Sequence, residues 1–319
     1  MKSNSNLPFL LAPSCSNYPW GGRRLIYDFG KKDDSNVVAE SWEFSTDSKN
    51  PCYAGSGEHK GKQLSQILNE HPEYLGVHPS FENSSLPLSI RFIDAKYGLS
   101  PSFYKPLNSA SEKSGNNSKI DKLIYVLDSN QESFFSYGFR HKISKERFFK
   151  VLSMGSINRF FNKIPIHQND ILLIEPGVIH SFGPNSLLID IQAAFDFSLD
   201  SLNKDENDVD IDLNSIPSSK SPIRVLKFKP GRATETLLRC EYFQVDRILV
   251  NTERTRNMVD YSSGLNTFQV FICYDGCGVF ESLEQDTFLN FFKGDCIFVP
   301  ANSADFKIHG KAEFLRIRC

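Results

Sequence analysis

NDILLIEPGVIH, residues 169–180, joins a polar turn, a run of apolar β-type residues and a second turn that contains Pro176 and ends in His180. KGDCIFVPA, residues 293–301, has the same order of turn, apolar run and proline, but no histidine follows Pro300 at the matching place. A short apolar run between two turn signals is typical of a buried β-strand. The two halves of the chain are therefore expected to contain β units of one kind.

Most of the remaining chain also has the pattern of short strands separated by clusters of Gly, Pro, Asn and Ser, at spacings typical of a β-sandwich or barrel. Such runs occupy residues 86–94, 123–127, 186–191, 268–273 and 296–300. The 27 phenylalanines suit a pleated, half-buried surface. Helical periodicity is confined to residues 63–70, with Leu64, Ile67 and Leu68 on one face, and to about 144–163, which begins at a capping serine.

Composition excludes several classes of function. A net charge of -2 over 319 residues gives no broad field to attract nucleic acid or acidic lipid, so we expect neither a nucleic-acid nor a membrane partner. No apolar run reaches the roughly 18–20 residues of a membrane helix, and a cytoplasmic protein is the default expectation. The seven cysteines are scattered without zinc-ribbon spacing and are expected to be mostly buried, reduced thiols.

The turn, strand and proline turn resemble the second motif of a cupin, in which the next strand is aimed into the mouth of a jelly-roll barrel. In metal-binding cupins a histidine after the Pro-Gly pair binds the metal, and His180 has that place in the first copy. The resemblance implies a mainly β protein of two cupin (jelly-roll) barrels with a small helical insert. We expect an N-terminal domain at 1–215, with the insert at about 144–163, and a C-terminal domain at 222–319. The acidic, then Ser/Pro-rich segment 203–221 would link them.

Further stretches are similar, in order and spacing, to the short bacterial form of type I mannose-6-phosphate isomerase. They include PWGG at 19–22, AESWE at 39–43, IRFIDAK at 90–96 and YVLD at 125–128. Membership of this family implies zinc-dependent interconversion of mannose 6-phosphate and fructose 6-phosphate in carbohydrate metabolism. In such chemistry the metal polarises the sugar oxygens and a nearby cation stabilises the oxyanion.

The positions at which that family holds its metal are mostly changed. Aligned without gaps, its four ligand positions fall on Ser102, Tyr104, Lys122 and His180, and its catalytic arginine falls on Asp200. Zinc requires several good N, O or S donors, and a lysine ammonium has no lone pair to give. We therefore expect the zinc to be absent here, with His180 as the one remaining ligand and as a hydrogen-bonded residue in a metal-free pocket.

Three hypotheses for function follow. The first is an isomerase homologue that has lost zinc binding and catalysis, a pseudoenzyme that keeps sugar-phosphate binding or has a regulatory role, with an active isomerase copy as a possible partner. The second is an active aldose-ketose isomerase with an atypical metal site, and the third is an unrelated cupin function. Lys122 could pair with Asp200 across the old cavity. The family-like stretches also mark candidate pocket residues, which are Arg91, Lys96, Asp190 and Gln192.

Overall fold

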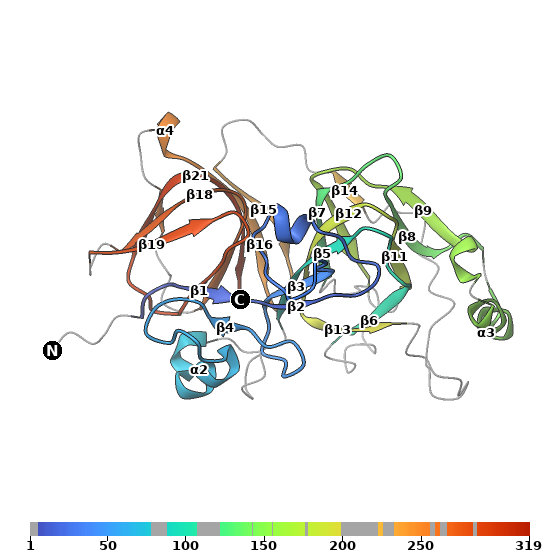
Figure 1. Ribbon diagram of the computed structural model, residues 1–319, viewed down its shortest axis with the longest axis horizontal. Helices are drawn as coiled ribbons and strands as arrows, with labels where there is room; N and C mark the ends of the chain where they lie inside the picture. Colours follow the sequence, from blue (N-terminus) through green and yellow to red (C-terminus); the bar gives the residue numbers. More distant parts are fainter. Residues whose placement is uncertain are drawn as a thin grey trace. The chain divides into compact units, whose positions relative to one another are not determined.

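The computed structural model describes residues 6–77, 88–106, 122–141, 143–154, 156–175, 178–198, 223–225, 233–255, 259–261, 267–282 and 286–319. The chain forms two compact units. Unit 1 contains Met1–Asn17, Arg23–Phe92 and Lys227–Cys319, and unit 2 contains Tyr18–Gly22 and Ile93–Leu226. Both are built mainly of strands (Figure 1), as the sequence predicts. None of the helices in the described part of the chain combines the length and the apolar character that crossing a membrane requires.

Unit 1 is built on a sheet of nine described strands in the order β15-β16-β21-β18-β20-β1-β4, with β17 paired to β21 and β19 to β18. Its long strands, β18 and β21, carry phenylalanines that pack into one core, in which the ring centroids of Phe280 and Phe306 lie 4.9 Å apart. The strands are β1 (Phe9–Ala12), β4 (Tyr53–Ala54), β15 (Thr234–Arg239), β16 (Gln244–Asn251), β17 (Val259–Tyr261), β18 (Gln269–Ser282), β19 (Thr287–Phe292), β20 (Cys296–Val299) and β21 (Phe306–Arg318).

The remaining elements of unit 1 come from the first part of the chain, except α4. Leu64, Ile67 and Leu68 are buried on one face of α2, which confirms the predicted helix. These elements are β2 (Ser14–Ser16), α1 (Arg24–Tyr27), β3 (Glu40–Phe44), α2 (Leu64–Glu70), η1 (Pro72–Leu75) and α4 (Thr252–Thr255). Strand β5 (Ser89–Ala95) passes from unit 1 into unit 2.

The division into units differs from the boundary expected between residues 215 and 222, which itself lies outside the described residues. Most of the first 92 residues lie in the same unit as the C-terminal barrel. Strand β1 is the reason, because it pairs antiparallel with β20 in the register Phe9↔Phe298. The backbone N–H and C=O groups on that edge of β20 are thereby paired with a strand from the far end of the chain.

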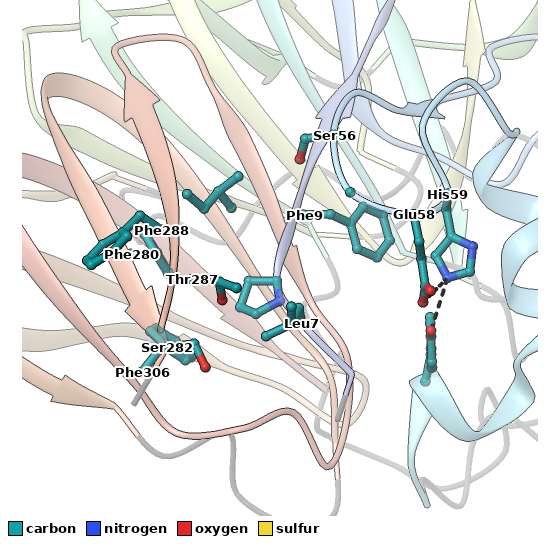
Figure 2. A pocket seen from close by; sticks show the side chains of 14 residues that line it. Leu7, Phe9, Ser56, Glu58, His59, Phe280, Ser282, Thr287, Phe288 and Phe306 are labelled. Carbon is teal, nitrogen blue, oxygen red and sulfur yellow. Dashed lines mark hydrogen bonds and ion pairs between the residues drawn. The ribbon is translucent and has the colours of Figure 1, made fainter. Parts of the chain in front are cut away.

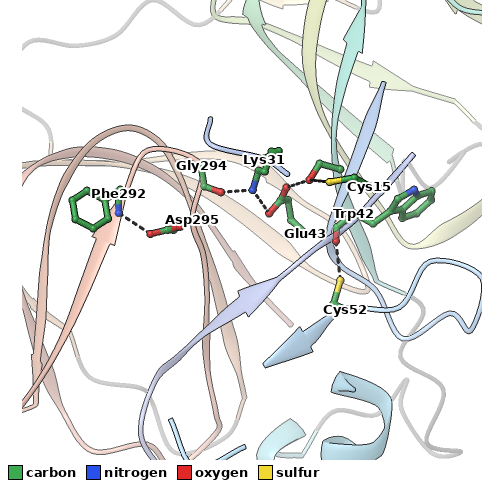
Figure 3. A network of polar contacts seen from close by, with 9 residues as sticks. Cys15, Lys31, Trp42, Glu43, Cys52, Phe292, Gly294 and Asp295 are labelled. Carbon is green, nitrogen blue, oxygen red and sulfur yellow. Dashed lines mark hydrogen bonds and ion pairs between the residues drawn. The ribbon is translucent and has the colours of Figure 1, made fainter. Parts of the chain in front are cut away.

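A buried polar network fixes the segment after α1 inside unit 1 (Figure 3). The Lys31 ammonium donates to Glu43 Oε2 at 2.8 Å and to the Gly294 carbonyl oxygen at 2.5 Å, and Ser41 Oγ donates to Glu43 Oε1 at 2.7 Å. Gly294 has φ +98°, and a Cβ there would lie 2.3 Å from the Phe29 carbonyl oxygen, so only glycine fits this turn.

A second network surrounds Asp246 on β16. The carboxylate accepts from Gln244 at 2.6 Å, from Thr236 at 2.7 Å and from Arg316 at 2.8 Å. Burial by itself would raise the pKa of Asp246, but these hydrogen bonds and the Arg316 charge outweigh it and lower the pKa. Asp246 is therefore ionised in the folded protein and ties β16 to its neighbours in the sheet.

Unit 2 has two sheets that enclose one apolar core. In one, the strands follow the order β14-β10-β7-β12, with β5 next to β12; in the other, the order is β13-β6-β11-β8-β9. The core contains Ile93, Ile124, Phe135, Leu172 and Leu188, among others. The strands are β6 (Ser102–Pro106), β7 (Lys122–Asp128), β8 (Phe134–Phe139), β9 (Phe161–Pro165), β10 (Asp170–Ile174), β11 (His180–Phe182), β12 (Ser186–Gln192), β13 (Ala194–Ser198) and β14 (Ile223–Val225).

The helical insert of unit 2 is shorter than predicted. Helix α3 (Lys145–Ser153) begins after Ser144, whose hydroxyl accepts from the Arg147 N–H at 3.3 Å as a cap, and a single turn, η3 (Ile157–Arg159), follows. The helical assignment of the last residues of 144–163 is wrong, because Phe161 begins β9. Its ring stacks on Phe139 with centroids 5.2 Å apart, and pairing with β8 outweighs the local helical pattern.

Candidate functional site

A group of polar side chains lies inside the apolar core of unit 2. Successive residues of a strand point to opposite faces, so Lys122 shares the face of Ile124 and Val126, and Asp190 and Gln192 share the face of Leu188. Ile124, Val126 and Leu188 belong to the core. Lys122, Asp190, Gln192 and His180 are accordingly 1–3% exposed. Four polar side chains, two of them ionisable with opposite charge, are therefore enclosed among hydrocarbon.

Lys122 and Asp190 form an ion pair. In the antiparallel ladder Gln192 lies opposite Lys122, and Asp190 lies opposite Ile124. Asp190 is thus the diagonal neighbour of Lys122, within reach of a long side chain. The Lys122 ammonium nitrogen is 3.3 Å from Asp190 Oδ2, with side-chain exposures of 2% and 1%. Each charge compensates the other, since an uncompensated charge at such a place would cost several kcal/mol.

The predicted partner of Lys122 was a different carboxylate. Asp200 lies outside the described residues, so its pairing with Lys122 stays a prediction. Among the described residues, the structure brings the carboxylate of Asp190 to Lys122, and the sequence analysis predicts Asp190 only as a pocket residue. The signal that could have found this pair is the strand register, because it decides which side chains of β7 and β12 are neighbours.

His180 begins β11, opposite Ser102 of β6 and Tyr137 of β8. Its Nδ1 lies 3.0 Å from the Val178 carbonyl oxygen. Because a carbonyl can only accept, Nδ1 carries a proton in this contact and donates it to the Val178 oxygen. The same arrangement orients metal-binding histidines, and it also satisfies a histidine in a core. His180 is thus hydrogen-bonded, as the sequence analysis expects.

Tyr137 and Gln192 complete the described polar layer. The Tyr137 oxygen accepts from the Glu175 N–H at 3.2 Å, and burial raises the pKa of Tyr137, so the phenol stays protonated. The side-chain oxygen of Gln192 is buried with no hydrogen-bond partner among the described residues. Ser102 is half-buried, and the backbone of Tyr104 pairs with Asp196.

The remaining pocket candidates have other surroundings. Arg91 donates to Glu40 at 3.2 Å and lies over the Trp42 ring at 4.8 Å. Lys96 is exposed and donates to Asn185 at 2.8 Å. Sequence reasoning missed Asp94, which is fully buried and lies so close to Gly22 that a Cβ there would be 2.2 Å from the carboxylate.

The side chains that the structure describes do not fit a zinc site of the family type. Among the described residues, no group of three or more His, Cys, Asp or Glu side chains could hold a metal ion. Of the family ligand positions, His180 alone offers a strong zinc donor among those whose side chains are described. Lys122 has no lone pair as an ammonium, and it forms an ion pair with the Asp190 carboxylate.

Two units built of antiparallel sheets, one of them with a histidine in its interior beside β8, define the class of the protein: it has the cupin fold of the phosphomannose isomerases. The solved structures agree. The mannose 6-phosphate isomerase from Bacillus subtilis matches with a TM-score of 0.76 at 22% identity, over 98% of this chain and 99% of that one. A zinc-bound mannose 6-phosphate isomerase matches with a TM-score of 0.68 at 12% identity, over 97% and 98%.

The sequence comparisons identify the particular family. The Mannose-6-phosphate isomerase ManA of Bacillus subtilis is 22% identical over 319 residues, which cover 96% of this chain and 97% of the relative. No protein-family model matches the chain. With curated relatives of one kind aligned over nearly the full length, the chain belongs to the mannose-6-phosphate isomerase family, as the sequence motifs predict.

Proposed function

We propose that this chain is a mannose-6-phosphate isomerase homologue that has lost zinc binding and isomerisation and that binds a sugar phosphate without converting it. The family and the fold support the sugar-phosphate part, because the relatives bear the name of an enzyme acting on mannose 6-phosphate. We keep a cytoplasmic location, and a regulatory role beside an active isomerase copy, as sequence-based parts of the proposal.

The ion pair between Lys122 and Asp190 carries the proposal. Lys122 stands where the family has a glutamate ligand, so a metal donor is replaced by a cation. Two positive charges about 4 Å apart repel by about 4 kcal/mol at an effective dielectric constant of 20, and a divalent ion doubles that figure. Asp190, which could offset this repulsion, is engaged by the ammonium at 3.3 Å. A zinc ion beside Lys122 would therefore be repelled by the ammonium and would also have fewer ligands than in the family.

The core of unit 2 then keeps its shape without a metal. Tyr137, His180 and the ion pair each have a hydrogen-bond or charge partner. These contacts hold the polar layer in place among the surrounding apolar side chains. These contacts supply no Lewis acid, and the sequence has Asp200 at the position that aligns with the family's catalytic arginine.

Elemental analysis of tag-free protein, with an isomerase assay on the same sample, tests the loss of zinc chemistry. We expect far less than one zinc per chain and no interconversion of mannose 6-phosphate and fructose 6-phosphate, even with added zinc. About one zinc per chain together with turnover that a chelator abolishes would overturn this half of the proposal. Isothermal titration with mannose 6-phosphate and with mannose tests the other half, and preference for the phosphate is expected. Equal heats, or none, would overturn it.

One observation favours the second hypothesis, an active isomerase with an atypical metal site. His180 Nδ1 donates to a backbone carbonyl, a contact that also orients metal-binding histidines, and Asp190 and Gln192 carry oxygens in the same buried layer. Metal binding there would require the Lys122–Asp190 pair to open. Chelator-sensitive turnover that is lost in His180→Ala, with wild-type folding, would establish this alternative.

A further inference from the structure

Unit 1 contains a pocket that the isomerase resemblance does not explain. Its volume is about 460 Å³, within the range of small-molecule sites. It lies between the start of β1, the loop after β4, η1, and the strands β18, β19 and β21 (Figure 2). Much of its wall is aromatic, with the rings of Phe9, Phe280, Phe288 and Phe306. Phe288 lines the pocket and is 60% exposed.

Polar side chains lie at two places in this aromatic wall. His59 Nε2 is 3.0 Å from the Tyr74 hydroxyl and 3.4 Å from Glu58 Oε1, as the dashed lines in Figure 2 show. The Ser282 hydroxyl on β18 lies away from this group. Ser282 is only 5% exposed, and its buried hydroxyl has no hydrogen-bond partner among the described residues. A buried hydroxyl without a partner is costly, and Ser282 lines the pocket. A ligand hydroxyl could satisfy it.

The charge of the pocket narrows the class of ligand. Glu58 is the charged side chain among the described residues that line it. Burial lowers the pKa of His59 from its ordinary value, so the imidazole is neutral at pH 7. An anion would meet a carboxylate and no compensating cation in this lining. A wholly apolar ligand would leave Ser282, His59 and Tyr74 buried against hydrocarbon without new hydrogen bonds.

We propose that this pocket binds an uncharged sugar. Sugar hydroxyls both donate and accept, which suits the mixed set of Glu58, His59, Tyr74 and Ser282. The C–H face of a sugar ring is apolar and packs on aromatic rings such as Phe288. This pocket lies in unit 1, and Lys122, Asp190, Gln192 and His180 do not line it, so it is a second binding site, independent of the proposed sugar-phosphate binding.

Titration calorimetry and saturation-transfer NMR with mannose, glucose and cellobiose test the proposal on the full chain. We expect at least one of these sugars to bind, and Phe288→Ala to weaken its binding about tenfold through the loss of an aromatic contact with the sugar ring. Phe292→Ala is the matched control, because Phe292 lies on the same strand at 64% exposure and does not line the pocket. Its affinity should equal that of the wild type.

Three results would overturn the inference. The first is no binding of any neutral sugar at millimolar concentration. The second is an affinity that Phe288→Ala and Phe292→Ala change equally. The third is saturable binding of the uncharged dye Nile red, sensitive to Phe288→Ala, without any sugar binding, which would mark an apolar-ligand site. Binding of mannose 6-phosphate that Phe288→Ala leaves unchanged would belong to the proposed function and not to this pocket.

Discussion

Replacing Lys122 by methionine tests the central feature of unit 2. Methionine keeps an unbranched side chain of similar length but removes the charge, so the Asp190 carboxylate, 1% exposed, would stay buried without its ammonium. Breaking a buried pair in this way costs about 3–5 kcal/mol. A domain of 150–250 residues loses about 2–4 °C of melting temperature per kcal/mol. Lys122→Met should therefore lower the melting temperature of unit 2 by about 6–20 °C.

Scanning calorimetry measures this change, and two further variants control it. Lys122→Met/Asp190→Asn removes both charges and should recover much of the loss, because a buried pair contributes little beyond its own desolvation. Lys62→Met removes an exposed ammonium that pairs with Glu70 at 2.9 Å, and solvent screening should leave its melting temperature close to that of the wild type. A shift below about 2 °C for Lys122→Met, taken as under 1 kcal/mol, or no recovery in the double variant, would refute the assignment of a buried, coupled pair.

Three other predictions concern unit 1. Gly294→Ala should reduce the free energy of unfolding in urea by about 2–4 kcal/mol, through positive φ and overpacking. Gly61→Ala, at φ +86° with nothing within 4 Å, should lose only about 1 kcal/mol; equal losses would contradict the predicted clash. Asp246→Asn should lower the urea midpoint by an amount that stays constant from pH 8 to 5. That difference in midpoint should shrink below about pH 4, because the pKa of Asp246 is lower in the folded than in the unfolded state, and the stability that this carboxylate contributes is lost as the pH falls through these values. A difference that stays constant below pH 4 would contradict the role of the Asp246 charge. Exposed Cys277 should react with a thiol reagent in the native protein well before Cys52, whose pKa burial raises; mass spectrometry of labelled peptides would reveal the reverse order.

Much of the fold was predictable because strand and turn signals are local. The apolar run at residues 170–174 between two turns became β10, and the matching run in the second half became β20 (Cys296–Val299). The face of α2 followed from spacing alone. Local signals failed at Phe161, where a helical pattern gave way to β9 because β8 offered a ladder and the Phe139 ring.

The sequence predicted that Lys122 and His180 belong to one site, and it did not predict the side chains that they contact. The family motifs located Lys122 and His180, and strand alternation explains why both point inward. Which carboxylate meets Lys122 depends on the register of β7 against β12, and this register is set by two apolar faces that have to be buried together.

The sequence by itself determined that the chain is a β protein with cupin-type turns, and it predicts a metal-ligand set altered from that of its relatives, because these signals reside in short segments. Only the tertiary structure decided that β1 pairs with β20 of the C-terminal part of the chain, that Lys122 pairs with Asp190, and that His59 and Ser282 line one pocket. Each of these joins residues far apart in the chain. Such contacts form when whole sheets bury their apolar faces, so no local pattern can specify them.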